Sequence, residues 1–181
     1  MGRMVALLRG INVGGCVLPM AELRSLCAEL GWDDVQTYIQ SGNIVFSAAG
    51  NTAALESSLE KAIEKRFGMK VSTIIRTAAQ WKHILQANPF PDVARATPNW
   101  LLLMVGKTIP PGGIEAAMEA TGRDNEQARS AGGILWLNYP AGVGQSKIVW
   151  PKKFEGEPFI ATTRNYRTAM KLGELLKGPD S

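Results

Sequence analysis

The sequence predicts an α+β fold in which two halves repeat one order of strands and helices. Hairpin signals occur twice, at Ser41-Gly42-Asn43 and at Ala131-Gly132-Gly133, and each lies between two short strand-like runs. Apolar residues at helical spacing flank each hairpin, and several of these runs end at a glycine. Of the 181 residues, 45% are hydrophobic and 20% are charged, which is the composition of an ordinary globular protein.

The first half is predicted to run strand, helix, strand, strand, helix, strand. Gly31 and Gly68 follow the last apolar residues of the two helical runs and are expected to end them. This βαββαβ order is the ferredoxin-like plan, with an antiparallel sheet and helices packed on it. The expected strands are 3–9, 35–40, 44–47 and 71–76, and the expected helices begin at Pro19 and at a cap formed by Asn51 or Thr52.

The second half is expected to repeat this order without an obvious final strand. Thr77-Ala78-Ala79-Gln80 matches a capping box at the start of a short helix, and the prolines after Asn88 break that helix. We expect a first ferredoxin-like subdomain at 1–90 and a second at 98–181, packed into one compact unit. The expected elements are strands at 100–105, 126–129 and 134–138, a helix from 114 to 121, and a helix from 164 to 177.

Several common chemistries lack their sequence signals. The chain has no Walker phosphate loop, no dinucleotide-binding glycine pattern and no zinc-protease motif, and its single histidine excludes a histidine-rich metal site. His83 is expected on the surface. Cys27 falls on an apolar helical face and is expected to be a buried structural thiol, whereas Cys16 lies in a predicted loop. No metal is expected, and no cofactor is assigned.

The location and the charge distribution are less specific. No apolar run approaches the roughly 18 residues of a membrane span, and the apolar start is too short for a signal peptide, so a cytoplasmic location is expected. The net charge of +4 lies in the stretch from Gln145 to Lys171, which has six basic and two acidic residues. This excess fits an anionic partner or a solvated surface, and the sequence leaves both readings open.

Three polar segments are candidates for binding. A glycine-rich loop with Arg9, Asn12, Gly14 and Gly15 follows the first strand, where backbone amides can turn toward an anion. A hairpin tip carries Gln40, Ser41 and Asn43. Thr163, Arg164, Asn165 and Arg167 are predicted to form a helix N-terminus capped by Thr163. Each segment also has a structural reading, in which its polar groups serve its own turn, loop or salt bridges.

Together these segments resemble the family of unknown function called DUF1697. The resemblance rests on Ala6 to Gly15, Met20 to Arg24, Thr37 to Phe46 and Thr162 to Thr168, and it covers nearly the whole chain. One departure is Cys16, since family members commonly have lysine after the paired glycines. The resemblance implies two ferredoxin-like subdomains and implies no activity.

The leading hypothesis is a binding site for an anionic or phosphate-bearing small molecule, such as a nucleotide. The three segments would converge, and the arginines would pair with the anion while the loop amides complete the site. A second hypothesis is binding of RNA or single-stranded DNA through Tyr38, Phe46, Trp136 and Tyr139. A third is a metal-independent enzyme using Tyr38, Cys16 or Lys147, and a fourth is an interaction module without a ligand. The oligomeric state is left unassigned.

Overall fold

The computed structural model describes residues 1–11, 17–123, 125–150, 153–154 and 157–178. The chain divides into two compact units: unit 1 comprises Met1–Lys82 and Leu172–Ser181, and unit 2 comprises His83–Lys171. The predicted subdomain boundaries, 1–90 and 98–181, differ from this division, because residues 83–90 lie in unit 2 and the C-terminal residues lie in unit 1. Helices α3 (Ala78–Gln86) and α6 (Tyr166–Lys177) therefore have residues in both units.

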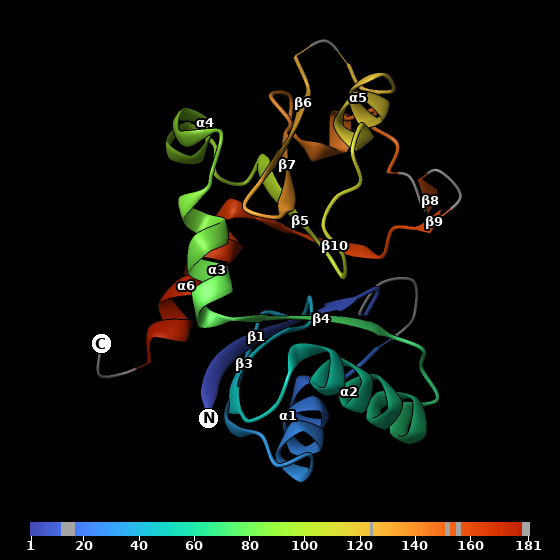
Figure 1. Ribbon diagram of the computed structural model, residues 1–181, viewed down its shortest axis with the longest axis vertical. Coiled ribbons are helices and arrows are strands. Elements are labelled where there is room, and N and C mark those ends of the chain that lie inside the picture. Colours follow the sequence, from blue (N-terminus) through green and yellow to red (C-terminus); the bar gives the residue numbers. More distant parts are fainter. Residues whose placement is uncertain (12–16, 124, 151–152, 155–156, 179–181) are drawn as a thin grey trace. The chain divides into compact units, whose positions relative to one another are not determined.

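Unit 1 contains one antiparallel sheet with two helices on one face, as Figure 1 shows. The strand order is β2-β3-β1-β4, and every neighbouring pair is antiparallel. The predicted βαββαβ order is confirmed. Its elements are β1 (Gly2–Arg9), α1 (Met20–Glu29), β2 (Asp33–Tyr38), β3 (Asn43–Ala48), α2 (Thr52–Phe67) and β4 (Ser72–Thr77).

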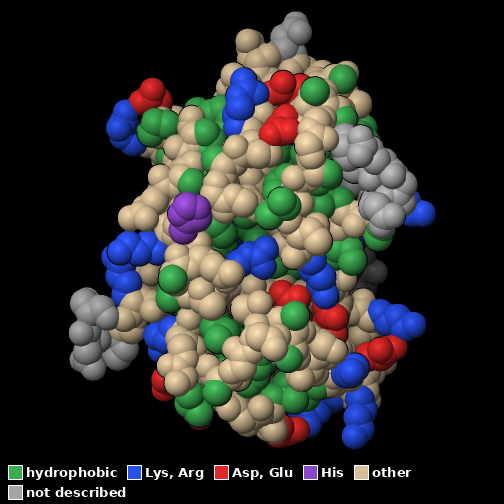
Figure 2. All heavy atoms as spheres, viewed as in Figure 1, with side chains coloured by type: hydrophobic (Ala, Val, Ile, Leu, Met, Phe, Trp, Pro, Cys, Tyr) green, Lys and Arg blue, Asp and Glu red, His purple; other side chains and the backbone are tan. Residues whose placement is uncertain are grey.

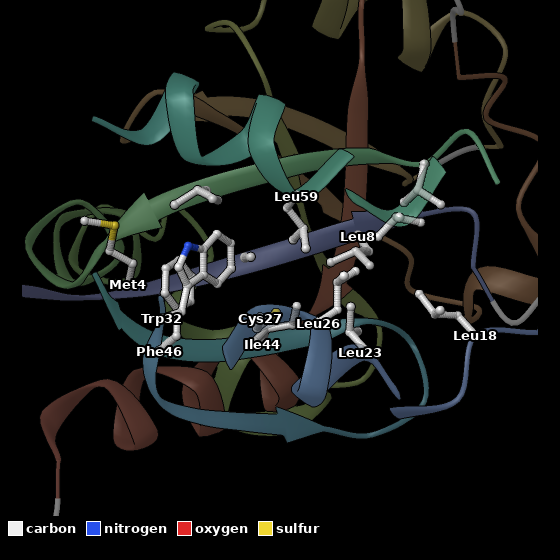
Figure 3. Packing of buried hydrophobic residues seen from close by; sticks show 14 of the residues in the cluster. Met4, Leu8, Leu18, Leu23, Leu26, Cys27, Trp32, Ile44, Phe46 and Leu59 are labelled. Atoms are coloured by element: carbon white, nitrogen blue, oxygen red, sulfur yellow. The ribbon is translucent and has the colours of Figure 1, made fainter. Parts of the chain in front are cut away.

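The core of unit 1 lies between that sheet and its two helices. Side chains at alternate positions of β1 and β3 point toward the helices, as the two-residue period of a strand requires. Leu8, Leu23 and Leu59 come from a strand and two helices and are all buried in this core (Figure 3). Trp32 stacks on Phe46 with their ring centroids 3.9 Å apart, which fixes the chain between α1 and β2 against the sheet.

The helix ends follow their predicted local signals. The side chain of Asn51 accepts a hydrogen bond from the Ala54 amide at 2.8 Å, so Asn51 is the cap of α2. Gly68 ends that helix in the left-handed conformation. At the start of α3, the Thr77 amide donates to the Gln80 side chain and the Gln80 amide donates to the Thr77 hydroxyl, which confirms the capping box.

Unit 2 contains a second antiparallel four-stranded sheet, of order β10-β5-β7-β6. The two sheets and their helices make the protein an α+β fold, as predicted. The connector predicted between the halves contains a short helix that begins at Pro91. The elements are α4 (Pro91–Ala96), β5 (Leu101–Gly106), α5 (Ile114–Glu119), β6 (Gln127–Ala131), β7 (Ile134–Asn138), η1 (Val143–Gln145), β8 (Lys153–Phe154), β9 (Glu157–Pro158) and β10 (Ala161–Asn165).

The last strand corrects the sequence prediction for the C-terminal segment. We expected no final strand and a helix beginning after Thr163, but Thr163 and Arg164 lie in β10, paired with Met104 and Leu103 of β5. Asn165, not Thr163, caps α6, because its side-chain oxygen accepts from the Thr168 amide at 2.8 Å. Pairing along the free edge of β5 outweighs the local capping signal that Thr163 provides.

Helix carboxylates cover one outer edge of each sheet. In unit 1, Glu60 and Glu56 of α2 accept hydrogen bonds from the amides of Thr73 and Ile75 on edge strand β4, each at 2.7 Å. These amides would otherwise face outward from the sheet. Glu56 and Glu60 are one helical turn apart and so lie on the same face of α2. The amides of Thr73 and Ile75 are two residues apart and so point from the same side of β4. The two carboxylates therefore bond two successive outward-facing amides of the edge strand.

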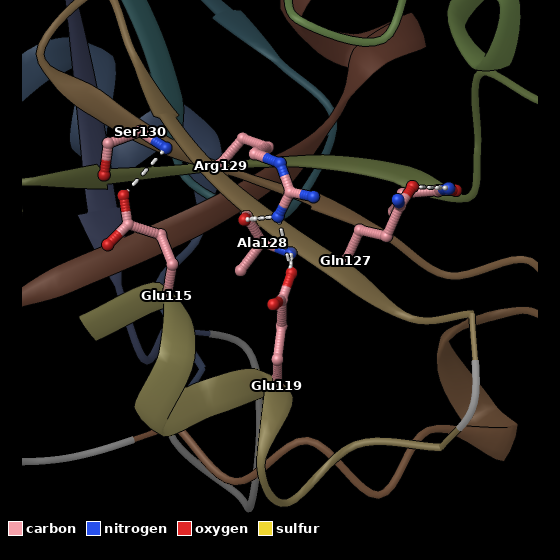
Figure 4. A network of polar contacts seen from close by, with 7 residues as sticks. Glu115, Glu119, Gln127, Ala128, Arg129 and Ser130 are labelled. Carbon is pink, nitrogen blue, oxygen red and sulfur yellow. Dashed lines mark hydrogen bonds and ion pairs between the residues drawn. The ribbon is translucent and has the colours of Figure 1, made fainter. Parts of the chain in front are cut away.

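Unit 2 has the same arrangement at β6, as Figure 4 shows. Glu119 of α5 accepts from the Ala128 amide at 2.7 Å, and Glu115 accepts from the Ser130 amide at 3.2 Å. Arg129 adds a third contact, since its Nη1 lies 2.7 Å from the Glu119 carboxylate. Both sheets therefore have an edge whose backbone donors are already used.

Candidate functional site

The structure brings the start of the glycine-rich loop and the hairpin tip side by side in unit 1. The Leu8 amide donates to the Gly42 carbonyl at 2.8 Å. Gly42 has a φ of +76°, and a Cβ built there would lie 2.6 Å from Ile11 Cδ1 and 2.8 Å from Leu8 Cβ. Only glycine fits this position. We call Arg9, Gly10, Ile11 and the segment 40–43 the loop–tip surface.

The hairpin tip is held by its own polar groups. Asn43 is fully buried, and its side-chain amide donates to the Tyr38 carbonyl and to the Ser41 hydroxyl, both at 2.9 Å. Asn43 therefore acts within the turn, as the structural reading of this segment anticipates. Beside it, Gln40 is exposed and Ser41 is half-buried. The tip thus presents two polar side chains on a turn that a third residue fixes.

One residue of the tip adopts a strained backbone conformation that sequence reasoning missed. Ile39 has a φ of +51°, in the left-handed region that β-branched residues avoid. Its side chain is 50% exposed, so no apolar pocket explains the conformation. Such a residue costs about 1–3 kcal/mol and persists where surrounding contacts enforce it, often at binding sites. No sequence signal could have indicated this strain, because isoleucine there predicts continued strand.

Arg9 supplies a positive charge at the same end of the sheet. It is the last residue of β1, pairs with Ser72 of β4, and is exposed. Among the described residues, no hydrogen bond or ion pair of its side chain is found. Asn12, Gly14 and Gly15, which we predicted to bind with Arg9, lie outside the described residues, as does Cys16.

The third predicted segment lies in unit 2, and its chemistry differs from the prediction. Arg164 is only 8% exposed, and its Nη1 donates to Thr162 Oγ1 at 2.9 Å and to the Thr163 carbonyl at 2.7 Å. Burial lowers the pKa of Arg164 to about 10. The guanidinium is therefore engaged with its own strand, and Arg164 lies in β10 rather than in the first turn of α6. Arg167 is exposed on α6.

The aromatic residues considered for stacking on nucleic-acid bases are mostly in the core. Phe46, Trp136 and Tyr139 are buried, and Tyr38 is half-buried. The Tyr139 hydroxyl accepts from Trp150 Nε1 at 3.2 Å, and burial raises the pKa of Tyr139 to about 12. These three buried rings cannot form an open stacking platform.

The remaining reactive residues show no shared site. Cys27 is buried in unit 1, as predicted, and burial raises the pKa of its thiol to about 12. His83 and Lys147 are exposed, and the imidazole is visible on the surface in Figure 2. Within the described part of the chain, no group of three or more His, Cys, Asp or Glu side chains could hold a metal ion. In the same residues, no helix is long and apolar enough to span a membrane.

Comparisons with known proteins give a family model and a solved structure that this chain resembles. A family model described as "Protein of unknown function (DUF1697)" matches residues 1–136. Among solved structures, the chain is similar to "conserved bacterial protein SP0830 from Streptococcus pneumoniae". The two are 25% identical, the match covers 98% of this chain and 99% of that chain, and the TM-score is 0.73. No curated protein matches the chain.

Proposed function

The chain belongs to the DUF1697 family, whose description assigns no activity, and from its residues we propose that it binds an anionic, phosphate-bearing small molecule, such as a nucleotide, at the loop–tip surface. The observation that carries this proposal is the close packing of Gly42 on Leu8 and Ile11. That packing joins two polar segments that lie about thirty residues apart in the chain. It holds them in a fixed relation, which a binding site requires.

The residues at this surface suit a phosphate. Arg9 can donate two parallel hydrogen bonds to phosphate oxygens, because a guanidinium presents its donors in a fixed planar fork. The exposed amide of Gln40 and the half-buried hydroxyl of Ser41 are neutral groups that can donate hydrogen bonds to the ligand. Gly10 has a φ of +74°, a conformation that turns the following chain. The predicted contribution of Asn12, Gly14 and Gly15 stays a prediction, because these residues lie outside the described part of the chain.

The proposal leaves out the arginines of unit 2. The Arg164 guanidinium already donates to Thr162 and to the Thr163 carbonyl, so moving it to a ligand would break bonds within β10. We also propose that each unit is a ferredoxin-like subdomain. The order βαββαβ in unit 1, and the matching strand order in unit 2, support this description.

A thermal-shift screen tests the binding proposal. Nucleotides, sugar phosphates and inorganic phosphate are added one at a time, and a ligand that binds the folded protein raises the melting temperature by mass action. The Arg9→Gln variant should lose the rise, whereas Lys61→Gln, which removes an exposed charge from α2 of the same unit, should keep it. Arg167→Gln, in unit 2, should also keep the rise, since the proposed site lies in unit 1. A rise that Arg9→Gln retains would refute the assignment to this surface.

A further inference from the structure

A second site is indicated by a hollow in unit 1, separate from the residues of the loop–tip surface. The hollow has a volume of about 260 Å³ and is lined by Arg3, Gln36, Glu174, Leu175 and Gly178. These residues come from β1, β2 and α6, together with Gly178, which directly follows α6. Since a water molecule takes about 30 Å³ of the liquid, the hollow has room for a ligand of several non-hydrogen atoms.

Arg3 is the most informative residue of this hollow because its guanidinium is poorly paired. Its side chain is only 19% exposed, and Nη1 lies 3.8 Å from Asp34 Oδ2, beyond hydrogen-bond distance. Nη2 donates to the Leu175 carbonyl at 2.9 Å. Nε is buried and has no hydrogen-bond partner among the described residues. A largely buried cation with so few acceptors is a group that a carboxylate would satisfy.

The opposite charge is also present around the hollow. Glu174 contributes a carboxylate to the lining, and α6 ends at Lys177, so its partial negative pole lies at the same place. Asp34 stands near the guanidinium on β2. A simple anion would meet this negative potential, and a simple cation would meet Arg3. A ligand with both charges complements both sides, and Gln36 can bond to either group.

We propose that this hollow binds a small zwitterion, a free α-amino acid, with its carboxylate on Arg3 and its ammonium group toward Glu174 and the end of α6. The side chain of Gln36, on β2, is part of the lining of the hollow. The size of the hollow limits the ligand to one amino acid rather than a folded peptide. This site is independent of the anion site proposed above.

Calorimetric titration of the full chain with the common amino acids, one at a time, tests this proposal. At least one should bind saturably, while propionate and ethylamine, which each have one of the two charges, should bind about tenfold or more weakly. Arg3→Gln should weaken binding by about tenfold or more, and Lys70→Gln, an exposed lysine outside the hollow, should not change it. Arg9→Gln should also leave it unchanged, which separates the two sites.

A second variant keeps the test decisive if Arg3→Gln does not fold. Gln36→Trp leaves Arg3 in place and fills the hollow, so it should abolish binding while circular dichroism shows the native fold. Three results would overturn the proposal: no amino acid binds, propionate binds as tightly as the amino acid, or the filled variant binds normally.

Discussion

Replacing Gly42 by alanine should destabilise unit 1 by more than the cost of placing alanine in the left-handed backbone conformation. Alanine in the left-handed region costs about 1–2 kcal/mol. The new methyl group would also lie under 3 Å from Leu8 Cβ and from Ile11 Cδ1, and such overpacking costs about 1–3 kcal/mol. The sum is about 2–5 kcal/mol, which is a large part of the stability of a typical domain.

Gly31→Ala is the matched control for this prediction. Gly31 has a φ of +77°, almost equal to that of Gly42, but a Cβ there has nothing within 4 Å. Gly31→Ala should therefore lose only about 1–2 kcal/mol, the cost of alanine in the left-handed conformation. The difference between the two variants, about 1–3 kcal/mol, measures the close approach of the hairpin tip to β1 and the loop.

Native-state hydrogen exchange at the Leu8 amide is the appropriate assay, because that amide donates to the Gly42 carbonyl. A loss of 2 kcal/mol corresponds to about thirtyfold lower protection. Urea unfolding, followed by circular dichroism, should show the midpoint fall by about 1 M or more for Gly42→Ala. Equal losses in Gly42→Ala and Gly31→Ala would refute the reasoning, because the packing of Gly42 would then contribute nothing.

Three further predictions concern titratable groups. Burial alone would raise the pKa of Glu115, but hydrogen bonds with Ser130 and with its own backbone, together with the charge of Arg129, outweigh burial and lower the pKa. The lowered pKa stabilises the fold above pH 4.5, and this stabilisation is lost as the pH falls through the folded value. Glu115→Gln should therefore flatten the acid side of the profile of urea midpoint against pH. The pKa of Tyr139 is raised to about 12, so its buried neutral hydroxyl should stabilise the folded state fully below pH 10 and lose this effect toward pH 12. In a spectroscopic pH titration, Tyr139→Phe should remove the tyrosinate absorbance step that occurs at the highest pH. Cys27, in a Cys16→Ser background, should react with a disulfide reagent about a thousandfold more slowly in the native state than in urea, since its pKa rises from 9.0 to about 12; comparable rates would show that the thiol is accessible.

Local chemistry made most of the fold predictable. The cap at Asn51, the left-handed end at Gly68 and the capping box at Thr77 are each decided by residues within one helical turn. The hairpin at Gly132 and Gly133 is similar, because both glycines take positive φ. These signals need no knowledge of distant contacts, and each of them is confirmed.

Strand β10 and the role of Arg164 could not be predicted in that way. Thr163 followed by Asn165 gives two possible helix caps, and the choice between them depends on pairing with β5, about sixty residues earlier in the chain. The burial of Arg164 and the contact of Gly42 with Ile11 likewise depend on residues distant in the chain, so local sequence signals could not predict them. The hollow beside Arg3 combines β1 with the chain's last helix, so no segment of sequence carries its signal.

The glutamates on β4 and β6 also limit how other polypeptides can be recognised. An extended peptide that joins a sheet needs a row of unused amides, and Glu56, Glu60, Glu115 and Glu119 already take those at the two covered edges. Strand addition along β4 or β6 is therefore disfavoured in the folded protein. Replacing these carboxylates would open new templates for self-association into fibrils.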